Sequence, residues 1–232
     1  MITSQSMSRP LLALLHLCDS LFPIGGFGYS DGLEAATAAG LVHTPDDLQE
    51  WLDVCLNEVV GRADGPAALR AWSAFDRRDW EALADVDEEI TAMRPSAATR
   101  RSSRAMGQRL VTTWRALYPD RRMEHLLDLA RRQRLGPALP IAFGCACASA
   151  GVPMRDTGAA FAYTRLTSTT SAALRLMRIG QTDAHARLAR TLDRVPVVVD
   201  AMTAGARPRS FAPAMDLSAM AQQYLHSRLF RS

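Results

Sequence analysis

The sequence predicts an all-α protein, a helical bundle or orthogonal helical array that forms one domain over residues 1–232. Apolar residues recur every three or four positions along nearly the whole chain, which is the spacing of a buried helix face. No stretch alternates apolar and polar residues for long enough to require a strand. No internal repeat or low-complexity linker divides the chain, and 232 residues are enough to bury a core.

The clearest predicted helix spans 44–60. Thr44 suits the N-cap, Pro45 suits the first helical position, and Asp47 occupies the third position of a capping box. One apolar stripe then follows at helical spacing, formed by Leu48, Trp51, Leu52, Cys55, Leu56, Val59 and Val60. Gly61 comes directly after the stripe and is expected to end the helix.

The same spacing predicts helices at 9–19, 30–40, 66–76, 78–92, 96–116, 121–134, 137–150, 156–178, 181–203 and 215–229. The β-like run 195–199 contains Pro196 and lies between helical signals, so we interpret it as helix entry or core. Ser, Thr and Ala fill 167–173, between Leu166 and Leu174. Because small residues allow close approach, we expect the 156–178 helix to be central. Residues 1–8 are expected to be flexible.

The bulk composition indicates a cytoplasmic globular protein. Hydrophobic residues make up 48% of the chain, but no apolar run reaches the roughly 18 residues of a membrane helix. Residues 1–8 lack the charged start of a secretory signal. Cys18, Cys55, Cys145 and Cys147 lie in apolar surroundings, so we expect them to pack as small hydrophobic residues.

Charge is segregated along the chain, and every basic residue is arginine. Residues 31–92 carry 15 acids and 4 arginines, whereas residues 93–134 carry 11 arginines and 3 acids. This separation favours docking to charged partners. The alternative function is an arginine-rich helical nucleic-acid-binding protein, centred on 100–134. Few aromatic residues and three interrupting acids make nucleic acid the less expected partner.

The patterns that carry enzyme or cofactor chemistry are missing from the sequence. The glycine-rich stretch 25–32 has no Lys for a phosphate loop, and Asp31 replaces the third glycine of a dinucleotide fingerprint, so it predicts a tight turn. The histidines are scattered, and Cys145 and Cys147 would point about 200° apart on a helix. No nucleophile elbow is present. We therefore expect no catalysis, no cofactor and no resident metal.

Five segments resemble the UreF family of urease accessory proteins and follow the family's order. Segment 19–34 contains a Pro, Gly-Gly-Phe, and Ser followed by Gly-Leu-Glu; 100–107 is an arginine-rich stretch that ends in Met-Gly. Segment 139–144 has the Pro-x-x-Phe-Gly element, 171–183 has Ser-Ala-x-x-Arg-Leu with Gly-Gln-Thr-Asp, and 227–232 is like the family's ending. The chain departs from the family at 222–226, where Gln-Gln-Tyr-Leu-His replaces His-Glu-Thr-Gln-Tyr, so no role is carried over there.

The resemblance implies an all-α, homodimeric scaffold without enzymatic activity. It implies that the scaffold binds the accessory protein UreD (also called UreH) and the GTPase UreG, regulates GTP use, and helps to deliver nickel to apo-urease. The residues assigned to partner binding are Pro23, Gly25, Gly26, Phe27, Tyr29, Ser30, Gly32, Glu34, Arg175, Gln181, Asp183, Arg228, Leu229, Phe230 and Arg231.

For three groups of these residues, the sequence also predicts how exposed or buried they are. Phe27 and Tyr29 are expected to be exposed interface anchors. Arg175, Gln181 and Asp183 are either partner-binding residues or a buried polar network. The tail 220–232 either packs on the protein's own core or becomes ordered when it binds UreD.

Overall fold

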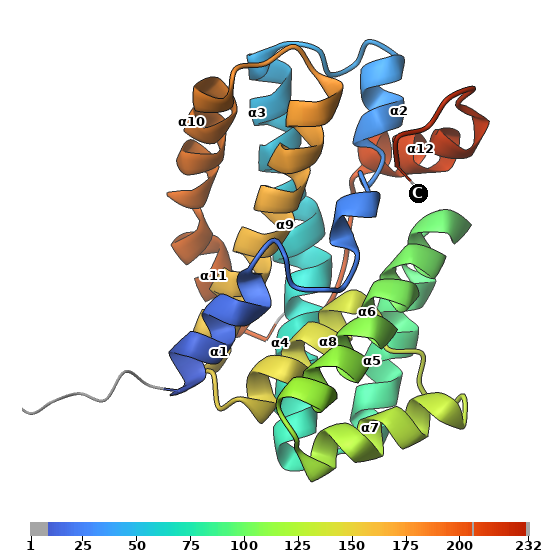
Figure 1. Ribbon diagram of the computed structural model, residues 1–232, viewed down its shortest axis with the longest axis vertical. Coiled ribbons are helices and arrows are strands. Elements are labelled where there is room, and N and C mark those ends of the chain that lie inside the picture. The colour runs from blue at the N-terminus through green and yellow to red at the C-terminus, as the bar shows by residue number, and fades with distance from the viewer. Residues whose placement is uncertain (1–8, 206, 231–232) are drawn as a thin grey trace, which may run out of the picture.

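The computed structural model describes residues 9–205 and 207–230, and it confirms the all-α fold class (Figure 1). The expected flexible segment 1–8 lies outside these residues. No strand occurs in the described part of the chain. The helical elements are α1 (Arg9–Cys18), η1 (Gly26–Gly28), α2 (Leu33–Ala38), α3 (Pro45–Val54), η2 (Cys55–Asp64), α4 (Gly65–Arg77), α5 (Trp80–Ala92), α6 (Ala97–Leu117), α7 (Arg121–Arg131), α8 (Leu139–Ser149), α9 (Met154–Leu176), α10 (Gln181–Leu192), α11 (Val195–Thr203), α12 (Pro213–Ala221) and η3 (Gln222–Tyr224).

One uninterrupted helical run, α3–η2–α4, passes through the molecule and organises the other helices (Figure 1). Helix α10 packs on α3, α9 and α11 pack along η2 and α4, α5 and α8 pack on α4, and α6 covers α8. Helix α9 also contacts α2, α8, α10 and α11, which confirms its predicted central position. Its buried hydroxyls are satisfied within the helix, because Thr169 and Thr170 donate to the carbonyls of Arg165 and Leu166.

The predicted capping box at the start of α3 is present. Thr44 Oγ1 accepts a hydrogen bond from the amide of Asp47, and Asp47 Oδ2 accepts one from the amide of Thr44 at 2.8 Å. The prediction that Gly61 ends this helix is wrong, because the chain continues as the π-helix η2. A Cβ at Gly61 would lie 2.8 Å from Val198 Cγ1 of α11, so the glycine allows close packing instead.

Other predicted helices differ at their boundaries, and the 121–134 helix ends at Arg131. The 30–40 helix begins only at Leu33, because Asp31 and Gly32 have φ values of 51° and 89°. The 181–203 helix breaks into α10 and α11, and Pro196 lies at the start of α11, where its missing N–H costs no helical hydrogen bond. The 215–229 helix is too long, since α12 ends at Ala221.

The buried side chains form one hydrophobic cluster that includes Phe75, Trp114 and Phe161. All four cysteines are free thiols, and three of them are buried, which confirms their packing as small apolar residues. Burial raises the pKa of Cys18 and of Cys55 to about 11. Within residues 9–205 and 207–230, no helix is long and apolar enough to cross a membrane, and no three His, Cys, Asp or Glu side chains group as metal ligands would.

Candidate partner-binding site at the docked C-terminal segment

The first motif segment lies directly beneath α12. Gly32 precedes α2 with a left-handed backbone, and a Cβ at this position would lie 2.7 Å from the amide nitrogen of Ala219. Only glycine permits both the positive φ and this backbone-to-backbone approach. The Ser-x-Gly-Leu-Glu sequence therefore brings the start of α2 against the C-terminal part of the chain (Figure 1).

A buried carboxylate holds the C-terminal segment in place. Glu34 is only 6% exposed, and Gln222 is fully buried. Gln222 Nε2 donates to Glu34 Oε2 at 2.8 Å, and Ser30 Oγ donates to Gln222 Oε1 at 3.1 Å. The backbone amides of Leu229 and Phe230 also donate to the Glu34 carboxylate. We call Ser30, Glu34, Gln222, Leu229 and Phe230 the C-terminal docking site.

Arg175 of α9 completes the contact from the opposite side. Its guanidinium carbon lies 4.1 Å from the centroid of the Phe230 ring, which is within cation–π distance. The Phe230 side chain is buried. Residues of the first, fourth and fifth motif segments therefore meet at one place, and the C-terminal segment packs on the protein's own helices.

The docked segment and α12 carry several exposed apolar side chains. Tyr224 is 81% exposed and Leu229 is 69% exposed, and Leu217 on α12 is 63% exposed. Phe211 and Met220 are further exposed apolar residues of the same segment. Large apolar side chains left exposed are candidates for contact with a protein partner. We call Leu217, Met220, Tyr224 and Leu229 the outer apolar face.

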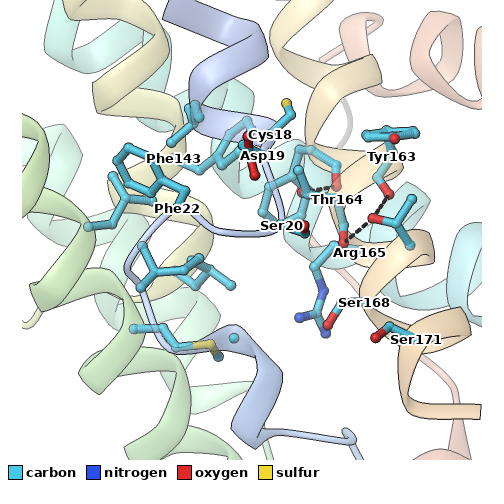
Figure 2. Close-up of a pocket in the computed structure, with 18 of the residues that line it drawn as sticks. Cys18, Asp19, Ser20, Phe22, Phe143, Tyr163, Thr164, Arg165, Ser168 and Ser171 are labelled. Carbon is cyan, nitrogen blue, oxygen red and sulfur yellow. Dashed lines mark hydrogen bonds between the residues drawn. The ribbon is translucent and has the colours of Figure 1, made fainter. Parts of the chain in front are cut away.

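The loop between α1 and α2 closes one wall of a cavity of about 530 Å³. Figure 2 shows Phe22 and Phe143 on one side and the hydroxyls of Thr164, Ser168 and Ser171 on the other. Tyr29 lines this cavity and is half-buried, so the expectation that it is an exposed anchor is wrong. The same expectation for Phe27 falls on a side chain outside the described part of the structure.

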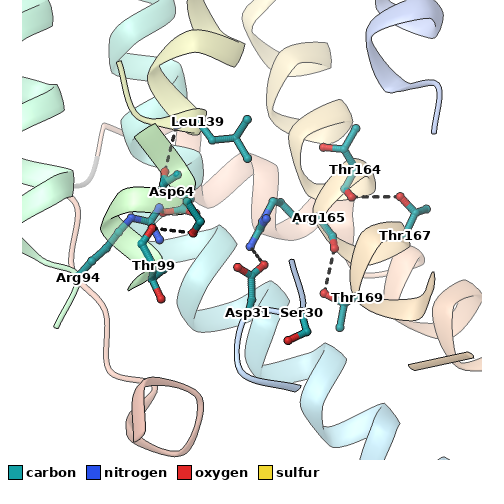
Figure 3. A network of polar contacts seen from close by, with 12 residues as sticks. Ser30, Asp31, Asp64, Arg94, Thr99, Leu139, Thr164, Arg165, Thr167 and Thr169 are labelled. Atoms are coloured by element: carbon teal, nitrogen blue, oxygen red, sulfur yellow. Dashed lines mark hydrogen bonds and ion pairs between the residues drawn. The ribbon is translucent and has the colours of Figure 1, made fainter. Parts of the chain in front are cut away.

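Two partly buried ion pairs lie close to the turn before α2 (Figure 3). Arg165 pairs with Asp31, whose φ is positive, and Arg94 pairs with Asp64 at 2.7 Å. Burial lowers the pKa of Arg165, but the carboxylates of Asp31 and Asp64 outweigh this and raise it. The Arg165 pair thus anchors the side chain of Asp31 at the turn that precedes α2. Sequence patterns did not indicate these contacts, because the four residues lie far apart in the chain.

Two other motif segments serve packing. A Cβ at Gly107 would overlap the carbonyl oxygen of Pro137, and one at Gly144 would overlap the carbonyl oxygen of Ala68. Ser103 Oγ accepts a hydrogen bond from the amide of Leu139 at 3.1 Å. The arginine-rich and Pro-x-x-Phe-Gly segments thus fit α6 and α8 closely to their neighbours.

The remaining predicted residues are dispersed. Arg175, Gln181 and Asp183 are all exposed, so the alternative of a buried polar network is wrong. Gln181 and Asp183 begin α10, which packs mainly on α3 and α9. Pro23, Gly25 and Arg228 are exposed and Gly26 is half-buried, whereas Arg231 lies outside the described residues.

Gln222 is the docking residue that sequence reasoning missed. Gln222 lies in the stretch 222–226, which does not match the family motif. No sequence pattern therefore pointed to this residue. The contact with Glu34 joins two residues that only the tertiary structure brings together.

Comparisons with known proteins agree on one family. The UreF family model matches residues 42–192. The chain is 30% identical to the urease accessory protein UreF of Granulibacter bethesdensis, over 99% of this chain and 97% of that protein. It is 33% identical to UreF 2 of Brucella canis, over 99% and 96%, and 31% identical to UreF of Methylibium petroleiphilum, over 96% and 94%.

Proposed function

We propose that this chain, which belongs to the UreF family of urease accessory proteins, acts in urease maturation as a non-enzymatic scaffold. It binds the accessory protein UreD (UreH) and the GTPase UreG, regulates GTP use, and takes part in nickel delivery to apo-urease. Nickel is the cargo of this assembly. The chain works in the cytoplasm as a homodimer.

The observation that carries the proposal is the outer apolar face on a segment that the protein itself holds in place. Tyr224 and Leu229 are exposed, while Glu34 fixes the backbone beside Leu229. A binding surface that is already ordered loses less conformational entropy on association than a free tail does. We assign UreD to this face. In this arrangement Leu229 and Phe230 are already docked on Glu34 before UreD binds.

Gln181 and Asp183 are assigned to a second contact, with UreG. They are exposed on the first turn of α10, and Arg175 lies near the end of the preceding helix, α9. Polar side chains at the rim of an interface contribute mainly to specificity and to association rate. This contact therefore tolerates partial disruption better than the apolar one does.

Co-purification with UreD and UreG homologues tests the proposal. The variant Tyr224→Ala/Leu229→Ala should weaken UreD binding by about tenfold or more, because exposed apolar anchors dominate binding energy. The Val197→Ala variant is the matched control, since Val197 is 73% exposed but lies on α11. Circular dichroism establishes that each variant is folded. The assignment fails if the double variant binds UreD as tightly as the unmodified chain does.

A further inference from the structure

The outer side of α6 is strongly basic and has no compensating acid on its own helix. Residues 97–117 contain five arginines and no Asp or Glu. Arg101, Arg104 and Arg109 are exposed, and Arg115 is half-buried. One face of α6 carries Arg101, Arg104 and Arg115. Together with the exposed residues Gln108 and Thr112, these arginines follow one another every three or four positions, which is the spacing of one helix face. We call Arg101, Arg104 and Arg115 the arginine face.

Acidic side chains elsewhere in the chain do not neutralise this face. None of the α6 arginines forms an ion pair with any acidic residue of 9–205 or 207–230. The neighbouring helix α7 differs, because Arg122 pairs with Asp120 and Arg131 pairs with Asp128. Asp87, the acid that interacts electrostatically with Arg104, already accepts the amides of Gly136 and Ala138.

The arginine face adjoins the C-terminal segment. Ser96 caps α6, and its hydroxyl donates to the carbonyl of Ala219 in α12 at 3.5 Å. Arg109 lies against Gly25 of the first motif segment, where a Cβ would overlap its guanidinium. The face therefore begins beside α12 and runs along α6, which Figure 1 shows extending away from the C-terminal segment.

We infer that the arginine face is a docking surface for an acidic protein surface. Arginine is enriched in protein interfaces, and its guanidinium matches carboxylates in bidentate geometry. From Arg101 to Arg115 the face spans about 21 Å, so the partner must present carboxylates over a similar length. The inference goes beyond the assignment of UreD to the outer apolar face and does not depend on it.

The composition of the surroundings favours protein over nucleic acid. Exposed Leu217 and Met220 lie on α12, the helix that α6 contacts at its start. Arginines next to exposed apolar side chains are typical of protein-binding sites. Within 97–117 the one aromatic residue, Trp114, is buried, so the exposed side of α6 carries no ring for base stacking.

Fluorescence anisotropy with labelled poly-L-glutamate tests the inference on the full chain. The unmodified protein should bind at low ionic strength and release the peptide as salt rises. Arg101→Glu/Arg104→Glu should weaken binding about tenfold, and the control Arg131→Glu/Arg132→Glu, with the same change in net charge, less than about threefold. Arg101→Gln/Arg104→Gln removes the charge without placing an acid near Asp87, and should weaken binding about threefold or more.

Three outcomes would overturn the inference. The first is no binding of poly-L-glutamate by the unmodified protein at low salt. The second is an equal loss in the α6 and α7 variants, which would mean that only net charge matters. The third is tighter binding of a charge-matched DNA duplex, abolished by Arg101→Glu/Arg104→Glu, which would make the face a nucleic-acid site. None of these results bears on UreD binding at Tyr224 and Leu229, so the two proposals fail separately.

Discussion

Gln222 Nε2 donates a 2.8 Å hydrogen bond to Glu34 Oε2, and both side chains are buried. The bond links the first turn of α2 to the residue that follows α12. The same carboxylate accepts the amides of Leu229 and Phe230. One acidic side chain thus accepts three donors, of which Gln222 Nε2 and the Phe230 amide are buried, and this fixes the path of the last described residues.

Replacement of Glu34 should release the C-terminal segment. Glu34→Ala removes the acceptor for three donors, so we expect a loss of about 1–3 kcal/mol in the free energy of unfolding. Hydrogen exchange should show faster exchange at Leu229 and Phe230, and slow exchange that persists in α4. Glu34→Gln keeps one acceptor oxygen and should have a smaller effect. Unchanged protection at Phe230 in Glu34→Ala would show that the Phe230–Arg175 contact holds the segment alone.

Motif glycines should differ in their tolerance of a methyl group. Gly107→Ala places a Cβ against the carbonyl of Pro137, and neither backbone can move without a shift of α6 or of 136–138. We expect a loss of about 1–3 kcal/mol, measured by urea denaturation. Gly26→Ala is the control, because its nearest neighbours lie 3.9 Å away, and it should change stability little. Equal effects at the two positions would contradict the close-packing role of Gly107.

Asp87 should be a structural acid. It is 2% exposed and accepts the amides of Gly136 and Ala138 at 2.9 and 2.8 Å. Asp87→Ala leaves both amides without their acceptor, so we expect a loss of about 2 kcal/mol or more. Asp85→Ala, an exposed acid on the same helix, is the control.

The contribution of Asp87 to the free energy of unfolding should change with pH in the opposite direction to that of an acid in a surface ion pair. Burial raises the pKa of Asp87 above its ordinary value. The hydrogen bonds from the amides of Ala138 and Gly136 lower this pKa, but burial has the larger effect. An acid with a raised folded-state pKa contributes more stability in its protonated form. The stability that Asp87 contributes should therefore increase as pH falls through the raised pKa. Thermal midpoints of the unmodified chain and Asp87→Ala, compared across this range, measure it.

The α3 capping box should weaken in acid. Hydrogen bonds from the amides of His43 and Thr44 lower the pKa of Asp47 from 3.8 to about 2. Because the folded-state pKa is depressed, the contribution of Asp47 is complete above about pH 4 and is lost as pH falls toward about 2. The difference in thermal midpoint between the unmodified chain and Asp47→Asn should shrink over this window. Glu50→Gln controls for charge loss on α3, and a constant Asp47→Asn difference would contradict the capping role.

The spacing of apolar residues and the capping residues predicted the helical character of this protein and most of its helix positions. Spacing and capping are local properties, so Thr44 and Asp47 predicted the start of α3, and small residues predicted the central position of α9. The five motif segments also indicated the family. Local signals gave the wrong prediction where tertiary packing sets the backbone conformation. Gly61 follows an apolar stripe, as glycines at helix ends do, but it lies inside a π-helix against Val198.

The contacts of the motif residues depend on tertiary packing. Glu34, Arg175 and Phe230 come from three distant segments, and their contacts arise because α2, α9 and the C-terminal segment pack together. Sequence periodicity identifies which face of a helix is buried, but it does not specify which partner lies opposite that face. The docking of the tail by Glu34 and the half-burial of Tyr29 follow from long-range packing, which sets burial and hydrogen-bond partners independently of sequence distance.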